Sequence, residues 1–142
     1  MKTIALVFIL LMFGSTFTYA LLNAFGEKGE RIQIPQEKIL NYELNEQQKK
    51  YLLSRGYTLI VYSYMTGCLD CITVKNNLER ITQNSDGQIF LQEIVKSEGT
   101  PKVSIISLNS EKTINNPTSN ELENVICDLL IARPLWCVSA KV

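Results

Sequence analysis

The sequence contains no histidine, one tryptophan and no excess of charge of either sign. Without histidine, a zinc site would have to be built from cysteine and carboxylate ligands alone, which makes a metal site a weak prediction. Fourteen acidic and fourteen basic residues give a formal net charge of zero, and no basic run occurs. This balance argues against nucleic acid or an anionic membrane surface as a partner. With 142 residues and no internal repeat, the chain is expected to form one globular domain plus one appendage.

The expected appendage is the N-terminal segment 1–25, which carries no charge after Lys2. A short basic start, an apolar centre at residues 4–13 and a small-x-small site at residues 18–20 are typical of a secretory signal peptide. The uncharged span is also long enough to cross a bilayer as one helix. Large residues around the cleavage site favour the uncleaved anchor. Both outcomes predict that the remaining chain lies outside the cytoplasm, either membrane-anchored or secreted.

Residues 26–44 contain glycine, proline and charged residues without steady periodicity, and they are interpreted as a spacer. Within it, Ile32 and Ile34 are candidates for a short edge strand before Pro35. The domain itself is predicted to span residues 45–142. Its first helix covers residues 45–55, with Asn45 as N-cap and Gln48 completing a capping box.

The most informative motif is Cys68-Leu69-Asp70-Cys71, which joins a predicted strand at residues 57–64 to a predicted helix. One face of that helix is apolar and begins with Cys71, which leaves Cys68 at the helix tip; the face comprises Cys71, Val74, Leu78 and Ile81. One accessible and one shielded sulfur within bonding reach is the geometry that thiol-disulfide exchange requires.

The helix start also explains why Cys68 should react. The positive end of the helix dipole stabilises a thiolate there and lowers the pKa of the cysteine below its usual value. Asp70 opposes this effect because a carboxylate repels a neighbouring thiolate. No basic residue is closer in sequence than Lys75 to offset it. The thiolate is therefore predicted to be only moderately stabilised.

Three further strands and one helix follow in the sequence. A turn at residues 84–87 leads to the second strand, and the last helix begins after Pro117 with Thr118 as N-cap and Glu121 completing a capping box. The later strands are predicted at residues 88–95, 102–108 and 113–114. The apolar face of the last helix comprises Leu122, Val125, Ile126, Leu129 and Leu130.

Cys127 and Cys137 lie ten residues apart and do not form a second Cys-x-x-Cys motif. Cys127 lies beside the apolar face of the last helix, and Pro134 ends that helix so that the tail can fold back onto it. We favour a structural disulfide between them in an oxidising compartment. Two unrelated thiols, or a second redox pair that relays electrons with Cys68 and Cys71, are the alternatives.

The order of helix, strand, Cys-x-x-Cys helix, strand, Thr-Pro, two strands and helix resembles the thioredoxin fold over residues 45–131. The resemblance implies an α/β architecture, a trimmed thioredoxin-like fold with a four-stranded mixed central sheet flanked by helices. The hydrophobic helix predicted from the uncharged N-terminal span precedes this fold. It also implies that Cys68 attacks and Cys71 resolves. By the same resemblance Pro101 is a cis-proline beside the active site, and the backbone of Thr100 faces the substrate chain.

Four features depart from thioredoxins proper. Gly67 stands where they have tryptophan, Leu69-Asp70 replaces Gly-Pro, and Tyr62 occupies the position of their buried proton-accepting carboxylate. The helix between the second and third strands is also largely missing, since only residues 96–99 separate Val95 from Thr100. Without the carboxylate, proton transfer to the resolving thiol is expected to rely on water.

Two classes of function fit these observations. The first is a thiol-disulfide oxidoreductase that needs no cofactor and exchanges disulfides with cysteine-containing client proteins and a redox partner protein outside the cytoplasm. The second is a non-catalytic binding module that keeps a structural Cys68–Cys71 disulfide, or a carrier of a soft metal such as Cu(I), which Met65 supports slightly. The sequence does not predict the direction of exchange, the natural substrate, the electron donor or the oligomeric state.

Overall fold

The computed structural model describes residues 32–139 of the chain. The signal peptide or membrane anchor predicted at residues 1–25 lies outside the described residues. Within the described part, no helix combines the length and hydropathy of a membrane span.

A five-stranded mixed sheet forms the centre of the described unit, in the order β1-β3-β2-β4-β5. β2 (Thr58–Met65) and β3 (Ile89–Lys96) pair in parallel, and β1 (Ile39–Leu40) adds to the outer edge of β3 in the same direction. On the other side of β2, β4 (Lys102–Ile106) and β5 (Glu111–Asn115) form an antiparallel hairpin. A helical crossover joins β2 to β3, because parallel neighbours cannot be joined by a tight turn.

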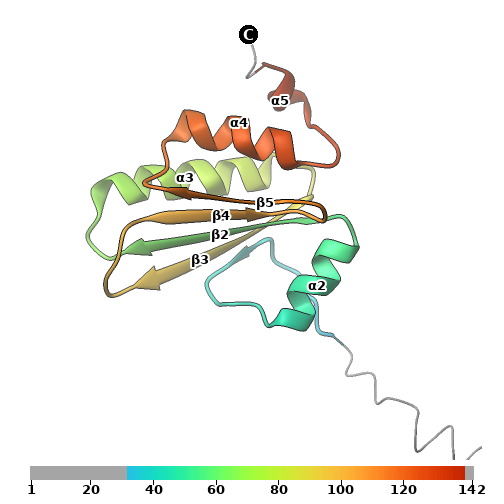
Figure 1. Cartoon of the computed structure of the whole chain (residues 1–142), viewed down its shortest axis with the longest axis horizontal. Helices are drawn as coiled ribbons and strands as arrows, with labels where there is room; N and C mark the ends of the chain where they lie inside the picture. Colours follow the sequence, from blue (N-terminus) through green and yellow to red (C-terminus); the bar gives the residue numbers. More distant parts are fainter. Residues whose placement is uncertain (1–31, 140–142) are drawn as a thin grey trace, which may run out of the picture. The chain divides into compact units, whose positions relative to one another are not determined.

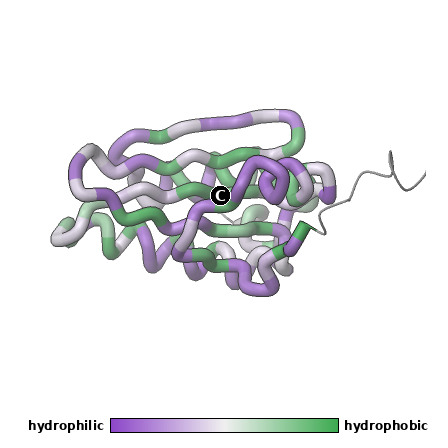
Figure 2. Tube along the Cα trace, turned by 90° about the horizontal axis from the view of Figure 1, so that it is seen from below, coloured by the Kyte–Doolittle hydropathy of each residue, from purple (hydrophilic) through white to green (hydrophobic). Residues whose placement is uncertain are grey.

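Helices cover both faces of this sheet, so the unit has three layers (Figure 1). α3 (Leu69–Gln83) and α4 (Ser119–Leu129) lie on one face, and α2 (Glu46–Ser54) lies on the other. Successive residues of β2 serve the two faces, because Ile60 packs in the core with α3 and α4 whereas Leu59 packs in the smaller core with α2. Hydrophobic residues are accordingly spread over several strands and helices and interrupted by hydrophilic ones (Figure 2).

The apolar helix faces predicted from the sequence are confirmed. Every member of the α3 stripe is buried against the sheet, with Leu78 fully inaccessible to solvent. In α4, Leu122, Val125, Ile126 and Leu130 are buried and Leu129 is partly buried. Burial of these two stripes fixes the position of the Cys-x-x-Cys segment, since Cys71 is itself part of the first stripe.

Only one of the two predicted capping boxes forms. In α2 the backbone N–H of Gln48 donates to the Asn45 side chain at 2.8 Å, and the N–H of Asn45 donates to the Gln48 side chain at 3.1 Å. In α4 the cap position is Thr118, as predicted, but its side chain makes no capping hydrogen bond, so the box with Glu121 is wrong. A further short helix, α5 (Leu135–Ser139), occupies the tail that was expected to fold back.

The sheet has five strands rather than the four that the sequence predicts. The additional strand is β1, in which Ile39 pairs with Leu91. Ile32 and Ile34 are exposed and form no strand, so the predicted edge strand is misplaced. Leu40 and Leu44 are buried in the core under α2, which means that part of the predicted spacer belongs to the folded unit.

The connection between β3 and β4 is short and contains no helix, as the sequence predicts. In the hairpin that follows this connection, Ser104 pairs with Thr113 across β4 and β5, and their hydroxyls hydrogen-bond at 3.0 Å. Side chains that point to one face of a strand alternate with those of the other. Ser104 therefore points to the opposite face from its buried neighbours Val103 and Ile105.

Candidate functional site

The Cys68–Cys71 pair occupies the junction between β2 and α3 and is oxidised in the structure. Its sulfur atoms lie 2.02 Å apart and its Cα atoms 5.2 Å apart. Cys68 is the N-cap of α3, and its Sγ accepts a hydrogen bond of 3.2 Å from the backbone N–H of Cys71. Gly67 has a φ of +82°, which non-glycine residues rarely adopt, and this conformation turns the chain from the strand into the cap.

The two sulfurs differ in accessibility. Cys71 belongs to the core and is only 2% exposed, whereas Cys68 is half-buried at the edge of the core. Cys68 is therefore the more accessible sulfur of the pair. Within residues 32–139, no three cysteine or carboxylate side chains come together in a way that would hold a metal ion.

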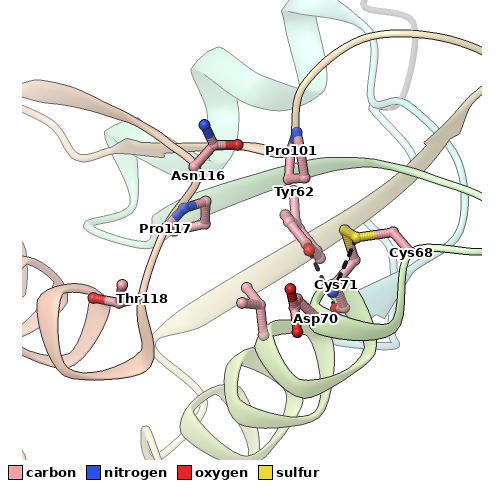
Figure 3. Close-up of a pocket in the computed structure, with 9 residues that line it drawn as sticks. Tyr62, Cys68, Asp70, Cys71, Pro101, Asn116, Pro117 and Thr118 are labelled. Carbon is pink, nitrogen blue, oxygen red and sulfur yellow. Dashed lines mark hydrogen bonds between the residues drawn. A yellow bond between two sulfur atoms is a disulfide. The ribbon is translucent and has the colours of Figure 1, made fainter.

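A cavity of about 500 Å³ opens beside the disulfide (Figure 3). Its walls come from the end of β2, the first turns of α3, the loop before β4 and the segment that connects β5 to α4. The lining residues are Tyr62, Cys68, Asp70, Cys71, Val74, Pro101, Asn116, Pro117 and Thr118. The cavity thus brings the disulfide together with two loops that lie far from it in the sequence.

Pro101 reaches this cavity, but not as a cis-proline. No peptide bond within the described residues is cis, so the conformation that the resemblance implied for Pro101 is wrong. The two isomers before proline differ by only about 0.5–1 kcal/mol, and the local sequence therefore does not decide between them. Thr100 is exposed and is not among the lining residues.

The pairing of β4 with β5 explains why Pro101 and Asn116 meet. Lys102 lies opposite Asn115 in the hairpin, so the residues just outside this pair are neighbours as well. The backbone N–H of Asn116 donates to the carbonyl of Pro101 at 2.8 Å. This bond ties the two loops that form the cavity wall opposite α3. Asn116 was not predicted as a site residue, although the predicted hairpin contains the information needed to place it.

Tyr62 lies under the disulfide, where the resemblance would place a carboxylate. Its side chain is buried, and its hydroxyl donates to the backbone carbonyl of Cys71 at 3.2 Å. Burial, together with Tyr64 and the carboxylate of Glu93, raises the pKa of Tyr62 to about 12. The hydroxyl therefore stays protonated near neutral pH and holds the first turn of α3 as a donor rather than as a base.

Glu93 is a buried carboxylate that the sequence analysis missed. It lies opposite Tyr62 on the neighbouring strand, and Lys75 of α3 contacts it at 3.1 Å. Burial raises the pKa of Glu93, the cation of Lys75 counteracts this, and the nearby Glu79 raises it further. Lys75 also contacts Glu79 at 3.4 Å. The sequence does contain a signal for this buried carboxylate, because Glu93 is a charged residue within the largely apolar run at residues 89–95.

Replacing Lys75 with methionine is expected to destabilise the fold by about 2 kcal/mol near neutral pH, because it leaves a buried carboxylate without its cation. A carboxyl group whose pKa is raised in the folded state costs stability only where it is ionised. The loss should therefore be small at about pH 4 and should grow as the pH rises through and above the usual range of glutamate. Urea denaturation at several pH values measures it.

Lys49→Met provides a matched control for this measurement. Lys49 contacts Glu43 and Glu46, whose side chains are 67% and 79% exposed, so its removal should cost less than about 1 kcal/mol. The double variant Lys75→Met/Glu93→Leu should regain most of the lost stability. A loss at Lys75 that is equal at all pH values, or that the second substitution does not relieve, would contradict this account of the pair.

Cys127 and Cys137 lie outside this site. In the structure their sulfur atoms are 1.97 Å apart, and both side chains are buried, at 1% and 3% exposure. The bond ties α4 to α5, and the indole N–H of Trp136 donates to the carbonyl of Asn84 at 3.1 Å, which anchors α5 to the end of α3. Neither cysteine lines the cavity beside Cys68.

No protein-family model and no curated protein matches the chain. Solved structures do. A redox protein from Chlamydomonas reinhardtii matches with a TM-score of 0.56 at 14% identity, over 89% of this chain and 47% of that one. The germline-specific thioredoxin protein Deadhead from Drosophila melanogaster matches with a TM-score of 0.51 at 13% identity, over 64% of this chain and 98% of that one. At these identities the likeness shows the fold: the chain has a thioredoxin-like fold with a Cys-x-x-Cys pair.

Proposed function

We propose that this protein is a thiol-disulfide oxidoreductase that exchanges disulfides with cysteines of client proteins through Cys68 and Cys71. The observation that carries the proposal is the difference in burial between the two sulfurs at the N-terminus of α3. A disulfide that serves stability alone has no need of an accessible sulfur beside an open cavity, whereas exchange requires one. The thioredoxin-like fold and the likeness to a redox protein support the same function.

In one direction the exchange begins with a client thiolate that attacks Sγ of Cys68. The Cys68–Cys71 bond breaks, Cys71 leaves as a thiolate, and a mixed disulfide joins the client to Cys68. A second client thiolate then attacks the client sulfur of this bond, which forms the client disulfide and releases Cys68 as a thiolate. Two electrons pass from the client to the protein. In the opposite direction reduced Cys68 attacks a client disulfide and Cys71 resolves the intermediate.

The charges around the site set how readily Cys68 exists as a thiolate. Its position at the N-terminus of α3 favours the negative form. Asp70 disfavours it, and Lys75 gives little compensation because it is engaged with Glu79 and Glu93. Since the hydroxyl of Tyr62 stays protonated, the proton of Cys71 is exchanged with water that enters the cavity. Slow turnover follows from the lack of a base at this position.

We also propose that the domain works outside the cytoplasm, either anchored by residues 1–25 or secreted after their removal. The uncharged N-terminal span and the buried Cys127–Cys137 pair support this location, because structural disulfides persist in oxidising compartments. A reporter fused after Val142 should be active only outside the cytoplasm. Activity of the reporter within the cytoplasm would exclude this location.

The experiment that tests the proposed function is capture of the exchange intermediate. A full-length Cys71→Ser variant is exposed to client proteins, and covalent adducts on Cys68 are detected by non-reducing electrophoresis and mass spectrometry. Adducts that disappear on reduction support the function, and their absence contradicts it.

A further inference from the structure

The cavity beside Cys68 has an unusual distribution of polarity among its lining residues. Val74, Pro101 and Pro117 provide apolar walls. Asp70 is the only carboxylate among the lining residues, and no lysine or arginine is among them. Figure 3 shows Asp70 in the first turn of α3, next to Cys71 and across the cavity from Pro117. The cavity is therefore largely apolar and negative at one side, with further polar groups from Tyr62, Asn116 and Thr118.

Asp70 takes part in none of the ion pairs among residues 32–139. Four cations of the described residues form ion pairs, and each of them pairs with a carboxylate other than Asp70. These cations are Lys49, Lys75, Arg80 and Arg133. Lys102 is next to Pro101 in sequence, but it lies opposite Ser63 and so shares the sheet face that is turned away from Tyr62 and α3. The carboxylate of Asp70 thus faces the cavity without a cation of the described chain to balance it.

We infer that this cavity binds a lysine or arginine side chain that stands close to the reacting cysteine of the client. Such a side chain has an apolar stem that fits against Val74, Pro101 and Pro117, and a cationic end that reaches Asp70. This inference rests on the proposed function and adds the chemistry of its substrate, a cysteine segment with an adjacent basic residue. A client with an acidic residue at the same place brings two negative charges together and is disfavoured.

Asp70 affects the chemistry as well as the binding. Its negative charge repels a thiolate at Cys68, because both belong to the first turn of the same helix. A cation bound to Asp70 reduces this repulsion at the moment when the client is in place. A basic client therefore gains twice, through its ion pair with Asp70 and through a more stable thiolate at Cys68.

The test uses the full chain with Cys71→Ser and three peptides that differ only beside their single cysteine, where they carry lysine, glutamine or glutamate. Each peptide cysteine is joined to thionitrobenzoate as a mixed disulfide. The Cys68 thiolate attacks the peptide sulfur, a peptide–Cys68 disulfide forms, and thionitrobenzoate leaves as a coloured thiolate whose release gives the rate. The initial rate of thionitrobenzoate release by the reduced chain that retains Cys71 provides a second measurement.

The lysine peptide should react about three- to fivefold faster than the glutamine peptide, and the glutamate peptide should be slower by a similar factor, as for a partly exposed ion pair. In Asp70→Asn all three rates should converge. The ratios of the three peptide rates are compared between the two variants, because an effect of Asp70→Asn on the reactivity of Cys68 changes all three rates equally and cancels in the ratios. Glu111→Gln is the matched control, since it removes one negative charge at the end of β5 that is remote from Asn116.

Three results would overturn the inference while leaving the proposed function intact: equal rates for the three peptides, a lysine preference that persists in Asp70→Asn, or a preference that Glu111→Gln reduces as much as Asp70→Asn. Release from none of the peptides by a folded protein would instead contradict the proposed function, and the inference with it. Circular dichroism of each variant verifies the fold.

Discussion

A Cys71→Ser variant is expected to accumulate mixed disulfides between Cys68 and client proteins, where the natural chain releases them. The reason is the burial of the two sulfurs. Cys68 is half-buried, whereas Cys71 is buried, so the proposed function assigns the attack to Cys68 and the resolving step to Cys71. When serine replaces Cys71, the first exchange step still occurs and the second cannot. Turnover should fall to the background rate, and adducts should be visible by non-reducing electrophoresis.

Cys68→Ser is the matched control, because it removes a sulfur of the same disulfide without leaving an accessible nucleophile. It should be as inactive as Cys71→Ser and should trap nothing. Equal trapping by both variants would show that Cys71 is also reached from outside. Both variants retain Cys127 and Cys137, which are 1% and 3% exposed, so adducts on those cysteines are not expected.

Removing the second disulfide with Cys127→Ala and Cys137→Ala is expected to lower the free energy of unfolding by about 3 kcal/mol, mainly because the unfolded chain gains freedom when a loop of this size is opened. The bond ties α5 to α4, and α5 contributes Trp136 to a contact with Asn84. The loss is measured by urea denaturation under non-reducing conditions. The rate of exchange at Cys68 should stay near that of the natural chain, because neither cysteine lines the cavity.

Two outcomes would contradict the structural role of this bond. Stability that does not change would mean that the pair contributes nothing to the fold. A loss of turnover at unchanged stability would instead favour the relay of electrons from Cys127 and Cys137 to the active pair. Cys68→Ala with Cys71→Ala serves as the comparison, since it opens a much shorter loop and should cost less stability.

The features that were predictable from the sequence are those encoded locally. The strand and helix around Cys68 follow from a short β-rich run and from a helical stripe, and Asn45 with Gln48 forms a capping box within four residues. Each of these signals lies inside one element or at its boundary. The missing helix before β4 was equally visible, because only a few residues separate the strands.

The features that were missed depend on contacts between distant segments. β1 has two residues, too few for any periodicity, and forms only because β3 offers an open edge. The pairing of Glu93 with Lys75 requires the register of β3 against β2 and the seating of α3 above them. The peptide before Pro101 is set by its tertiary surroundings, which the dipeptide alone does not specify.

The cavity illustrates the same distinction. Cys68 and Asp70 were identified because they belong to a local motif. Asn116 was not, because only the register of β4 with β5 brings it beside Pro101. The sequence therefore predicts the Cys-x-x-Cys pair, whereas the cavity beside it is visible only in the folded chain.

The reduction potential of the Cys68–Cys71 couple distinguishes an exchanging disulfide from a structural one. It is determined by equilibrating the full chain with glutathione buffers and quantifying the two thiols by alkylation and mass spectrometry. An exchanging couple should have a potential between about −270 and −120 mV, the range of known exchange proteins. A potential below about −300 mV would contradict the proposed function, because a disulfide that stable is structural and does not pass electrons to or from clients.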